Sequence, residues 1–401
     1  MSGDSLFDVA IIGAGIAGAS LAWRVAPHLG VVLVERETQP GYHSTGRSAA
    51  MFMESYGPPA VRALTRASRA FYENPPPSFT DAPLLSPRGA LYLAEPEQQP
   101  LLDAMRAVLL PTCPALQQLS RDAVLARVPC LRPECVLAGL MDEDAQDIDV
   151  NALHQGFLRG LRQRGGVLRT DACLRSATRA GAGAPWWELQ LADGSTLRCR
   201  HVVNAAGAWA DEVAAMFGAA PVGLVPCRRT AFTFKPPEGV DASRWPVVAG
   251  VDESYYFKPD AGQLLGSPAN ADPTPPHDVQ PEELDVATGI ARIEAVSTLR
   301  IRRPSSTWAG LRSFVRDGEP VIGWDGACPG FFWLAAQGGY GIQSAAAAAE
   351  LAAALLRELP LPEALALHGV DKFALSRQRL QSQPVHRTRS GRRLRRADRT
   401  A

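Results

Sequence analysis

The sequence predicts an α/β protein. Three times along the chain, an apolar run typical of a buried strand leads through a glycine-containing turn into an apolar helix, with the junctions at residues 13, 207 and 338. Between the second and third junctions lie about 115 residues that are rich in short strand patterns. Buried strands connected through helices, together with a long strand-rich insertion, indicate an α/β core with a second sheet, and so an α+β protein overall.

The first junction carries the clearest motif. A buried strand at 7–12 runs into residues 13–18, which read GAGIAG and open a helix. In such a G-x-G-x-x-G turn the glycines allow a tight turn, a close approach of backbone N–H groups to a pyrophosphate, and close packing of helix on strand. A second strand at 31–34 ends at Glu35, which lies 22 positions after Gly13, where an acidic residue binds a ribose hydroxyl. We therefore expect a dinucleotide to bind at this end of the chain.

Periodicity justifies the other elements in order. We expect helices at 58–71, 98–109, 150–164, from about 211, and at 344–356, and strands at 88–95, from 201, and at 331–336. Asp193-Gly194 is typical of a hairpin turn.

The loop at 40–50 has small residues, two hydroxyls and Arg47. It could form a second binding contact with a pyrophosphate or with the edge of a ring system. The acidic run at 142–149 lacks the spacing of a calcium loop, so we interpret it as a solvated turn in which Asp149 caps the next helix.

The composition is that of an ordinary globular protein. Its 401 residues, 46% of them apolar, allow two or three domains. Basic and acidic residues balance at 41 each, but residues 376–401 hold nine arginines and one aspartate. We expect this tail to be a solvated, disordered extension. The alternative is that it binds nucleic acid or a membrane surface.

Cysteine and histidine usage excludes several classes. Seven scattered cysteines without a C-x-x-C pattern favour reduced thiols and a cytoplasmic protein. The apolar run at 9–23 is too short to cross a bilayer. The seven histidines are dispersed, with neither a metal-spaced pair nor a G-x-S-x-G motif in the chain. We therefore expect no metal site and no classical hydrolase.

Several longer segments resemble one family of flavoproteins. They read IIGAGIAGAS at 11–20, ERETQPGYHSTGRSAA at 35–50, VNAAGAW at 203–209, YYFKPDAGQLLGSPANADP at 255–273, TWAGLRSF at 307–314 and AAQGGYGIQ at 335–343. Together they resemble the D-amino acid oxidase superfamily, and most closely its bacterial D-arginine or D-amino acid dehydrogenase branch. The resemblance spans almost all of residues 7–375 and leaves out only the arginine-rich tail.

The resemblance implies FAD, bound without a covalent link, and two interleaved domains. Residues 1–84, 140–222 and 310–376 would form a Rossmann-type FAD-binding domain, 85–139 and 223–309 a substrate-binding domain with a mixed or antiparallel sheet, and 377–401 the basic tail. No cysteine occurs at 311–314, where related covalent amine oxidases carry one. The implied cofactor-binding residues are Gly13, Ala14, Gly15, Ala17, Gly18, Glu35, Arg36, Ser44, Thr45, Gly46, Arg47, Ser48, Ala49, Ala206, Gly207, Trp209, Gly310, Gly338, Gly339, Tyr340, Gly341, Ile342 and Gln343.

The resemblance also implies an amino acid site. Arginine suits a carboxylate anchor because its planar fork binds carboxylate in a bidentate manner and keeps its charge. Arg312 and Arg229 match the family's carboxylate-binding arginines, and Tyr56 and Tyr256 match the hydroxyl donors beside them. Gly339 would accept the substrate amine through its carbonyl, with Gln343 close by. The implied reaction is oxidation of a D-amino acid by hydride transfer from Cα to flavin N5.

The far end of the pocket departs from the arginine-selective pattern. Ala90 stands where arginine-selective relatives carry a glutamate, and Met51 and Met53 stand where they carry polar residues. Since a buried guanidinium needs a carboxylate partner, these exchanges predict a pocket that has lost most preference for D-arginine and favours apolar side chains. A compensating acid elsewhere, and with it a D-arginine dehydrogenase proper, is the alternative.

The electron acceptor and the rival activities complete the expectations. An apolar Leu264, where amine-oxidising relatives place a lysine, favours a dehydrogenase that uses a quinone or another acceptor. A sarcosine, glycine or other secondary-amine oxidase of the same superfamily is a second enzymatic hypothesis. A flavoprotein that serves as a binding module through its basic tail is a third, and it predicts salt-sensitive nucleic-acid binding, which we do not expect.

Overall fold

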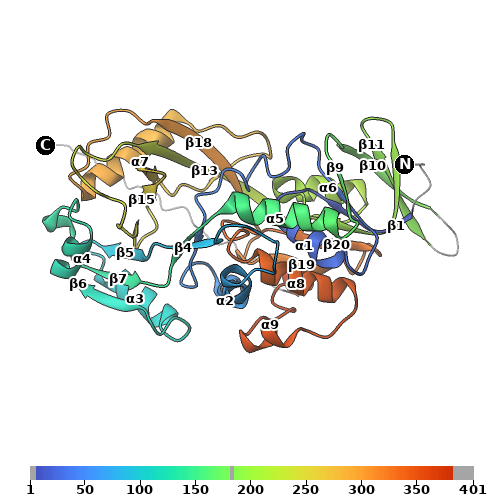
Figure 1. Ribbon diagram of the computed structural model, residues 1–401, viewed down its shortest axis with the longest axis horizontal. Coiled ribbons are helices and arrows are strands. Elements are labelled where there is room, and N and C mark those ends of the chain that lie inside the picture. Colours follow the sequence, from blue (N-terminus) through green and yellow to red (C-terminus); the bar gives the residue numbers. More distant parts are fainter. Residues whose placement is uncertain (1–5, 181–184, 383–401) are drawn as a thin grey trace, which may run out of the picture.

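The computed structural model describes residues 6–180 and 185–382. The chain forms an eight-stranded sheet at one end, a nine-stranded sheet at the other, and a small three-stranded sheet between them (Figure 1). The eight-stranded sheet has the order β10-β11-β12-β1-β2-β9, with β20 beside β12 and β19 beside β20. Its strands are β1 (Leu6–Ile12), β2 (Val31–Val34), β9 (Val167–Arg169), β10 (Leu174–Ala180), β11 (Trp186–Leu191), β12 (Thr196–Asn204), β19 (Val321–Trp324) and β20 (Phe331–Ala335).

Alternate residues of the central strands bury opposite faces of this sheet. β1 pairs in parallel with both β2 and β12, and β20 also runs parallel to β12. On one face, Val9 and Ile11 join the cluster that packs against helices α1 (Ile16–Val25), α5 (Val150–Gln163) and α8 (Ala345–Leu356). On the other face, Ala10 and Ile12 join the cluster that contains residues of α6 (Ala210–Met216). The continuous apolar runs in the sequence follow from this burial on both faces.

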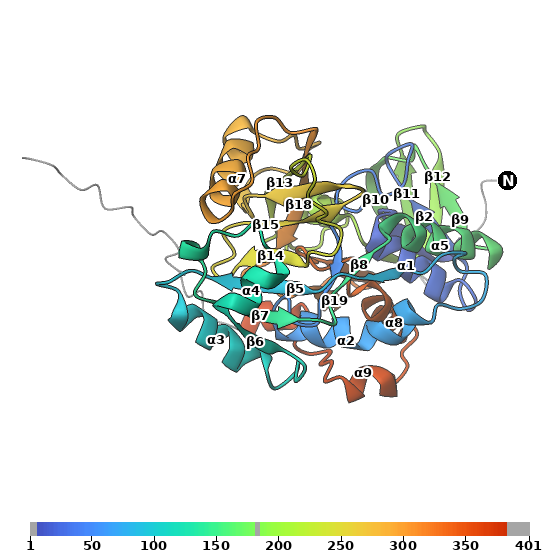
Figure 2. The same cartoon turned by 60° about the vertical axis from the view of Figure 1, so that its left-hand side comes forward.

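The nine-stranded sheet is mostly antiparallel and has the order β17-β13-β16-β15-β14-β5-β7-β6, with β18 beside β13. Helix α7 (Glu283–Val296) lies along its outer side, and α3 (Gln99–Leu109) and α4 (Arg121–Arg127) lie near β6 and β7 (Figure 2). The strands are β5 (Ala90–Ala94), β6 (Gln117–Ser120), β7 (Ala138–Asp142), β13 (Val225–Phe234), β14 (Val247–Gly250), β15 (Tyr256–Asp260), β16 (Gln263–Ser267), β17 (Asp272–Pro273) and β18 (Ser306–Phe314).

The three-stranded sheet has the order β3-β8-β4 and carries part of the expected pocket. Its strands are β3 (Met51–Phe52), β8 (Gln146–Ile148) and β4 (Leu85–Pro87). Met51 on β3 pairs with Asp147 on β8. The remaining helical elements are α2 (Pro59–Glu73), η1 (Pro133–Cys135), η2 (Gly207–Trp209), α9 (Glu363–Leu367) and α10 (Gln378–Ser382). No helix in the described ranges has the length and apolar character that crossing a bilayer requires.

The helices and strands that the sequence predicts at the three junctions are confirmed, and so is the α/β class. The division into domains stays a proposal. It agrees in outline with the sheets, since the eight-stranded sheet draws its strands from 6–34, 167–204 and 321–335. The nine-stranded sheet draws its strands from 90–142 and 225–314, so β7 and β18 reach past the proposed boundaries at 139 and 309.

The acidic run is not solvated throughout. Asp149 does cap α5, because its Oδ1 accepts a hydrogen bond of 2.8 Å from the N–H of Ala152. Asp147, however, lies between Lys258 and Arg88, with Asp147 oxygens at 2.5 and 2.7 Å from their nitrogens. Asp142 is buried. The interpretation as a solvated turn was therefore wrong for buried Asp142 and half-buried Asp147, which both have side-chain partners distant in sequence.

The first residues of the expected tail pack against the fold. Arg377 is ion-paired at 2.8 Å with Asp325, whose side chain is fully buried, and Arg379 is ion-paired at 2.8 Å with Asp317. Arg377 and Arg379 are therefore not part of a solvated extension, because both pair with carboxylates of the folded part of the chain. The remainder of the tail, 383–401, lies outside the described residues.

Candidate active site

A cavity of about 430 Å³ lies at the carboxyl ends of the parallel strands of the eight-stranded sheet. The ends of β1 and β2, at Ile12 and Val34, line it, and so do the turns that follow β12 and β20. This edge is where open α/β sheets bind ligands. We call it the large cavity. Most of the expected cofactor-binding residues line it, whereas Ala14, Gly18, Gly46, Tyr340 and Gln343 are not among its lining residues.

The glycines of the first junction act through close backbone approach. Gly13 has a φ of +101°, and a Cβ on Gly18 would lie 1.9 Å from the carbonyl oxygen of Gly13. Gly18 thus allows α1 to sit against the turn, as the motif predicts, without facing the cavity. Gly15 precedes α1 and offers no side-chain cap of its own, but Ile16 N–H in the first turn donates to the hydroxyl of Thr45 at 3.0 Å. The partial positive charge of a helix N-terminus favours an anionic group nearby.

Glu35 is oriented by the backbone around it. Its Oε2 accepts a hydrogen bond of 2.8 Å from Ala14 N–H, and its Oε1 accepts one of 3.0 Å from Glu37 N–H. The carboxylate is buried and lines the large cavity. Each carboxylate oxygen can accept a further bond, so Glu35 can serve a ribose hydroxyl as the sequence predicts.

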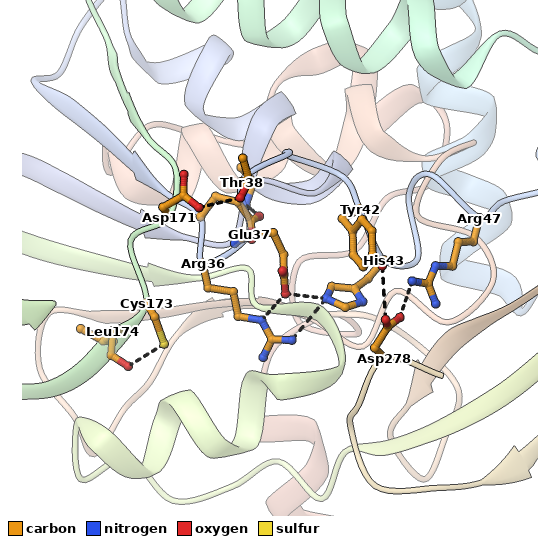
Figure 3. Close-up of polar contacts among 12 residues, drawn as sticks. Arg36, Glu37, Thr38, Tyr42, His43, Arg47, Asp171, Cys173, Leu174 and Asp278 are labelled. Atoms are coloured by element: carbon orange, nitrogen blue, oxygen red, sulfur yellow. Dashed lines mark hydrogen bonds and ion pairs between the residues drawn. The ribbon is translucent and has the colours of Figure 1, made fainter. Parts of the chain in front are cut away.

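A polar cluster next to Glu35 was not expected from the sequence (Figure 3). Arg36 lies over the ring of Trp209, with 3.9 Å between the guanidinium carbon and the ring centroid, and its Nε donates to Glu37 at 2.8 Å. His43 Nε2 lies 2.9 Å from the same Glu37 oxygen. Burial opposes ionisation of Glu37, but the hydrogen bonds with His43 and Arg36 outweigh it and lower the pKa of the carboxyl. The cluster positions Arg36, His43 and Trp209, all of which line the large cavity.

The loop at 40–50 forms hydrogen bonds with residues more than two hundred positions later in the sequence. Tyr42 donates to Asp278 at 3.2 Å, and Arg47 is ion-paired with the same carboxylate (Figure 3). Arg47 also donates to the carbonyl of Val279 at 2.9 Å, and Trp308 donates to the carbonyl of Arg47 at 3.1 Å. The ion pair with Arg47 lowers the pKa of Asp278. This loop, which forms a wall of the large cavity, is thereby linked to the segment before α7 and, through Trp308, to β18 of the nine-stranded sheet.

Two arginines come together at the other end of the large cavity because of strand register. β13 and β18 pair antiparallel, with Arg229 opposite Gly310 and Cys227 opposite Arg312, so the two arginines are diagonal neighbours. Arg312 Nη1 donates to the hydroxyl of Tyr56 at 3.1 Å. Arg229 Nε is buried and has no partner among the described residues. Burial and the charge of Arg312 lower the pKa of Arg229. Two adjacent guanidinium groups repel each other, so an anion bound between them would stabilise both charges.

Gly339 lies directly against the guanidinium of Arg312. A Cβ at this position would lie 2.6 Å from Arg312 Nη1, so a glycine is required for the guanidinium to lie there. Burial lowers the pKa of Arg312, but the hydroxyls of Tyr56 and Tyr256 outweigh it, and the pKa is raised overall. The structure therefore brings together all five expected catalytic residues, Arg312, Arg229, Tyr56, Tyr256 and Gly339, around one space.

A second cavity of about 100 Å³ opens beside these five residues, and we call it the small cavity. Met51, Met53 and Ala90 line it together, as the sequence predicts for an apolar pocket. Sequence reasoning missed three further lining residues, Tyr92, Lys258 and Glu253. The alternation of β5 could have revealed Tyr92, because it is two residues after Ala90 and so points to the same face. Nothing local marked Lys258, whose Nζ lies 2.5 Å from Asp147 and 4.0 Å from Met51 Sδ.

The structure shows other contacts for Gln343 and Leu264 than the sequence analysis expects. Gln343 donates through Nε2 to the carbonyl of Tyr56 at 3.2 Å and to the hydroxyl of Thr65 at 2.9 Å, so it holds the Tyr56 loop in place. Leu264 is fully buried in the apolar cluster with Leu91 and Phe257, and it lines neither cavity. The argument from Leu264 to the electron acceptor therefore has no support in the site geometry.

The large cavity fits the FAD that the sequence implies. It extends from the glycine turn at 13–15 and Glu35, which suit a pyrophosphate and a ribose, to the turn at 338–341. At that far end, the side-chain amide nitrogen and oxygen of Gln337 are both buried without a partner among the described residues, and Gln337 lines the cavity. Unpaired buried polar atoms of this kind are satisfied when a ligand with polar edges binds.

Comparison with known proteins gives the same assignment. A family model described as "FAD dependent oxidoreductase" matches residues 8–355. The FAD-dependent oxidoreductase domain-containing protein 1 of Bos taurus is 24% identical over 405 residues, which cover 88% of this chain and 81% of that protein. Mitochondrial dimethylglycine dehydrogenase of Homo sapiens is 31% identical over 142 residues, 35% of this chain but only 16% of that protein's length.

Solved structures show the same fold. L-proline dehydrogenase from P. horikoshii superposes with a TM-score of 0.80 at 18% identity, covering 94% of this chain and 98% of that one. Iminodiacetate oxidase from Chelativorans sp. BNC1 superposes with a TM-score of 0.75 at 22% identity, covering 92% and 98%. Glycine oxidase from Geobacillus kaustophilus gives 0.76 at 20% identity, covering 91% and 98%.

Proposed function

This chain belongs to the family of FAD-dependent oxidoreductases, and from this premise we propose that it is a D-amino acid dehydrogenase whose pocket favours apolar side chains over the guanidinium of D-arginine. The proposed reaction removes a hydride from the substrate Cα, and the resulting imino acid hydrolyses to a 2-oxo acid and ammonia. FAD, when bound, supplies the hydride acceptor. The chain itself binds, orients and desolvates the amino acid.

The pair of arginines carries the proposal. Arg312 and Arg229 lie side by side at the junction of the two cavities, and neither guanidinium is paired with a carboxylate among the described residues. A substrate carboxylate would supply that anion, with the hydroxyl of Tyr56 already held in place by Arg312. The carbonyl of Gly339 is the proposed acceptor of the substrate amine. The substrate side chain would then enter the small cavity.

The side-chain preference rests on Met51, Met53 and Ala90, which contribute apolar surface to that cavity. One acid also lines it: Glu253, in an exposed position with a φ of +56°. Glu253 favours the alternative of a D-arginine dehydrogenase proper, because it could face a guanidinium. We place this alternative second, since water screens an exposed carboxylate and weakens such a pair.

Steady-state kinetics on a panel of D-amino acids tests the preference. We expect kcat/KM for D-methionine or D-leucine to exceed that for D-arginine. The variant Ala90→Glu should raise kcat/KM for D-arginine by roughly 10- to 100-fold, because a carboxylate then meets the guanidinium. Ala90→Gln is the matched control, with nearly the same shape and no charge, and should not produce this gain. A wild-type preference for D-arginine would overturn the proposal.

A secondary-amine substrate is the second candidate, favoured by the small size of the second cavity, about 100 Å³. Glycine oxidase and iminodiacetate oxidase, whose names give substrates without a side chain on Cα, both share the fold. Sarcosine and iminodiacetate tested beside the D-amino acids decide between the two. A quinone or another small acceptor and a cytoplasmic location complete the proposal, and oxygen consumption per turnover tests the first.

A further inference from the structure

A chain of hydrogen bonds links a buried carboxyl to the small cavity. Asp142, at the end of β7, accepts a hydrogen bond of 2.5 Å from the hydroxyl of Ser55, and that hydroxyl lies 3.0 Å from the hydroxyl of Tyr92. The three residues are 8%, 5% and 5% exposed. The other oxygen of Asp142 accepts from Asp144 N–H at 3.2 Å. The carboxyl is therefore fixed on both sides, and its only side-chain partner among the described residues is Ser55.

Tyr92 stands where the substrate side chain is expected. It follows Ala90 by two residues on β5 and shares an apolar cluster with Ala90 and Met53, so its side chain projects from the same face of the strand. It lines the small cavity together with those two residues. Burial raises the pKa of Tyr92, so its hydroxyl stays protonated at the pH values of ordinary assays.

Two neighbouring polar groups of the small cavity are already engaged. Lys258 Nζ is paired with Asp147 at 2.5 Å, and the hydroxyl of Tyr56 accepts from Arg312 at 3.1 Å. The Tyr92 hydroxyl makes one hydrogen bond, with Ser55, while a tyrosine hydroxyl can donate one bond and accept another. Tyr92 thus keeps capacity for a partner beside the apolar side chains of Ala90 and Met53.

We propose that the Tyr92 hydroxyl is the polar end of the side-chain pocket, and that it selects D-amino acids with a short hydroxyl-bearing side chain over apolar isosteres. Ser55 and Asp142 are positioning residues, because they act on the substrate only through Tyr92. This inference rests on the proposed D-amino acid dehydrogenase function. A substrate hydroxyl would complete the bonding of Tyr92, whereas an isosteric methyl group would leave that buried hydroxyl incompletely paired.

Matched substrate pairs test the proposal on the holoenzyme. D-threonine is compared with D-valine, and D-serine with D-2-aminobutyrate, since each pair exchanges a hydroxyl for a methyl group. We expect kcat/KM to favour the hydroxyl member by about tenfold in the wild type. Tyr92→Phe should bring this ratio close to one, and Ser55→Ala should lower it part of the way. The double variant should match Tyr92→Phe, because Ser55 then has no hydroxyl to position.

Tyr72→Phe is the matched control. It removes another buried tyrosine hydroxyl, one that donates to the carbonyl of Ile342 and lines neither cavity, and should leave the ratio unchanged. A purely structural effect of any variant would lower both members of a pair alike and leave the ratio as in the wild type. If D-amino acids reduce the flavin but the ratio is the same in the wild type and Tyr92→Phe, this inference is overturned and the proposed function stands. If no D-amino acid reduces the flavin, both are overturned.

Discussion

The guanidinium of Arg312 lies so close to the backbone of Gly339 that a single added Cβ would come within 2.6 Å of Nη1. The two residues belong to different segments, β18 and the turn after β20, and they meet where the large and small cavities join. The contact fixes the proposed carboxylate anchor above the proposed amine acceptor. It also makes the anchor sensitive to one methyl group.

Gly339→Ala should therefore displace Arg312 and lower kcat/KM by on the order of 100-fold, since small misplacements of a binding group are costly. Gly326→Ala is the matched control, because its Cβ would meet only Gln378 Nε2, at 3.8 Å. Flavin content and melting temperature should be close to wild type in both variants. Unchanged kinetics in Gly339→Ala would contradict the assigned position of Arg312.

Asp278 should influence how tightly FAD is held, although we expect it to make no contact with FAD itself. Its carboxylate bonds to Tyr42 and Arg47, both in the wall of the large cavity, and so links this wall to the segment before α7. Asp278→Asn keeps the shape but removes the charge, and we expect flavin to dissociate from the diluted holoenzyme about tenfold faster. Asp241→Asn is the control, an exposed aspartate that bonds only its own turn in the described part of the chain. Equal dissociation rates in the two variants would show that the loop is held by other contacts.

The features that the sequence predicts are those set by local patterns of residues. The strand–glycine–helix turn at Gly13 and the acidic Glu35 follow from short-range spacing, and the apolar wall follows from substitutions at single positions. The juxtaposition of Arg229 with Arg312 depends on the register of two strands from distant parts of the chain, which no local pattern encodes. The same holds for the contacts of Asp278, Asp142 and Asp147, whose side-chain partners lie on other elements.

The ion pair between Asp317 and Arg379 should make stability depend on pH in the acid range. Burial raises the pKa of Asp317, but the hydrogen bond and charge of Arg379 outweigh it and hold the pKa below 3.8, its ordinary value. The resulting contribution, about 1 kcal/mol for a partly exposed pair, is fully present above pH ~4 and is lost as the pH falls through the lowered pKa. Urea unfolding of the wild type and Asp317→Asn should show a difference that is constant from pH 5 to 7 and shrinks toward pH 3. A difference that grew on acidification would contradict this sign.

The most direct test of the central claim is the absorption spectrum of the purified flavoprotein, recorded without oxygen before and after addition of one substrate. We predict that D-methionine bleaches the oxidised flavin band, that L-methionine leaves it unchanged, and that D-arginine bleaches it more slowly than D-methionine at equal concentration. Bleaching by the L-enantiomer, or by sarcosine alone, would contradict the proposed function.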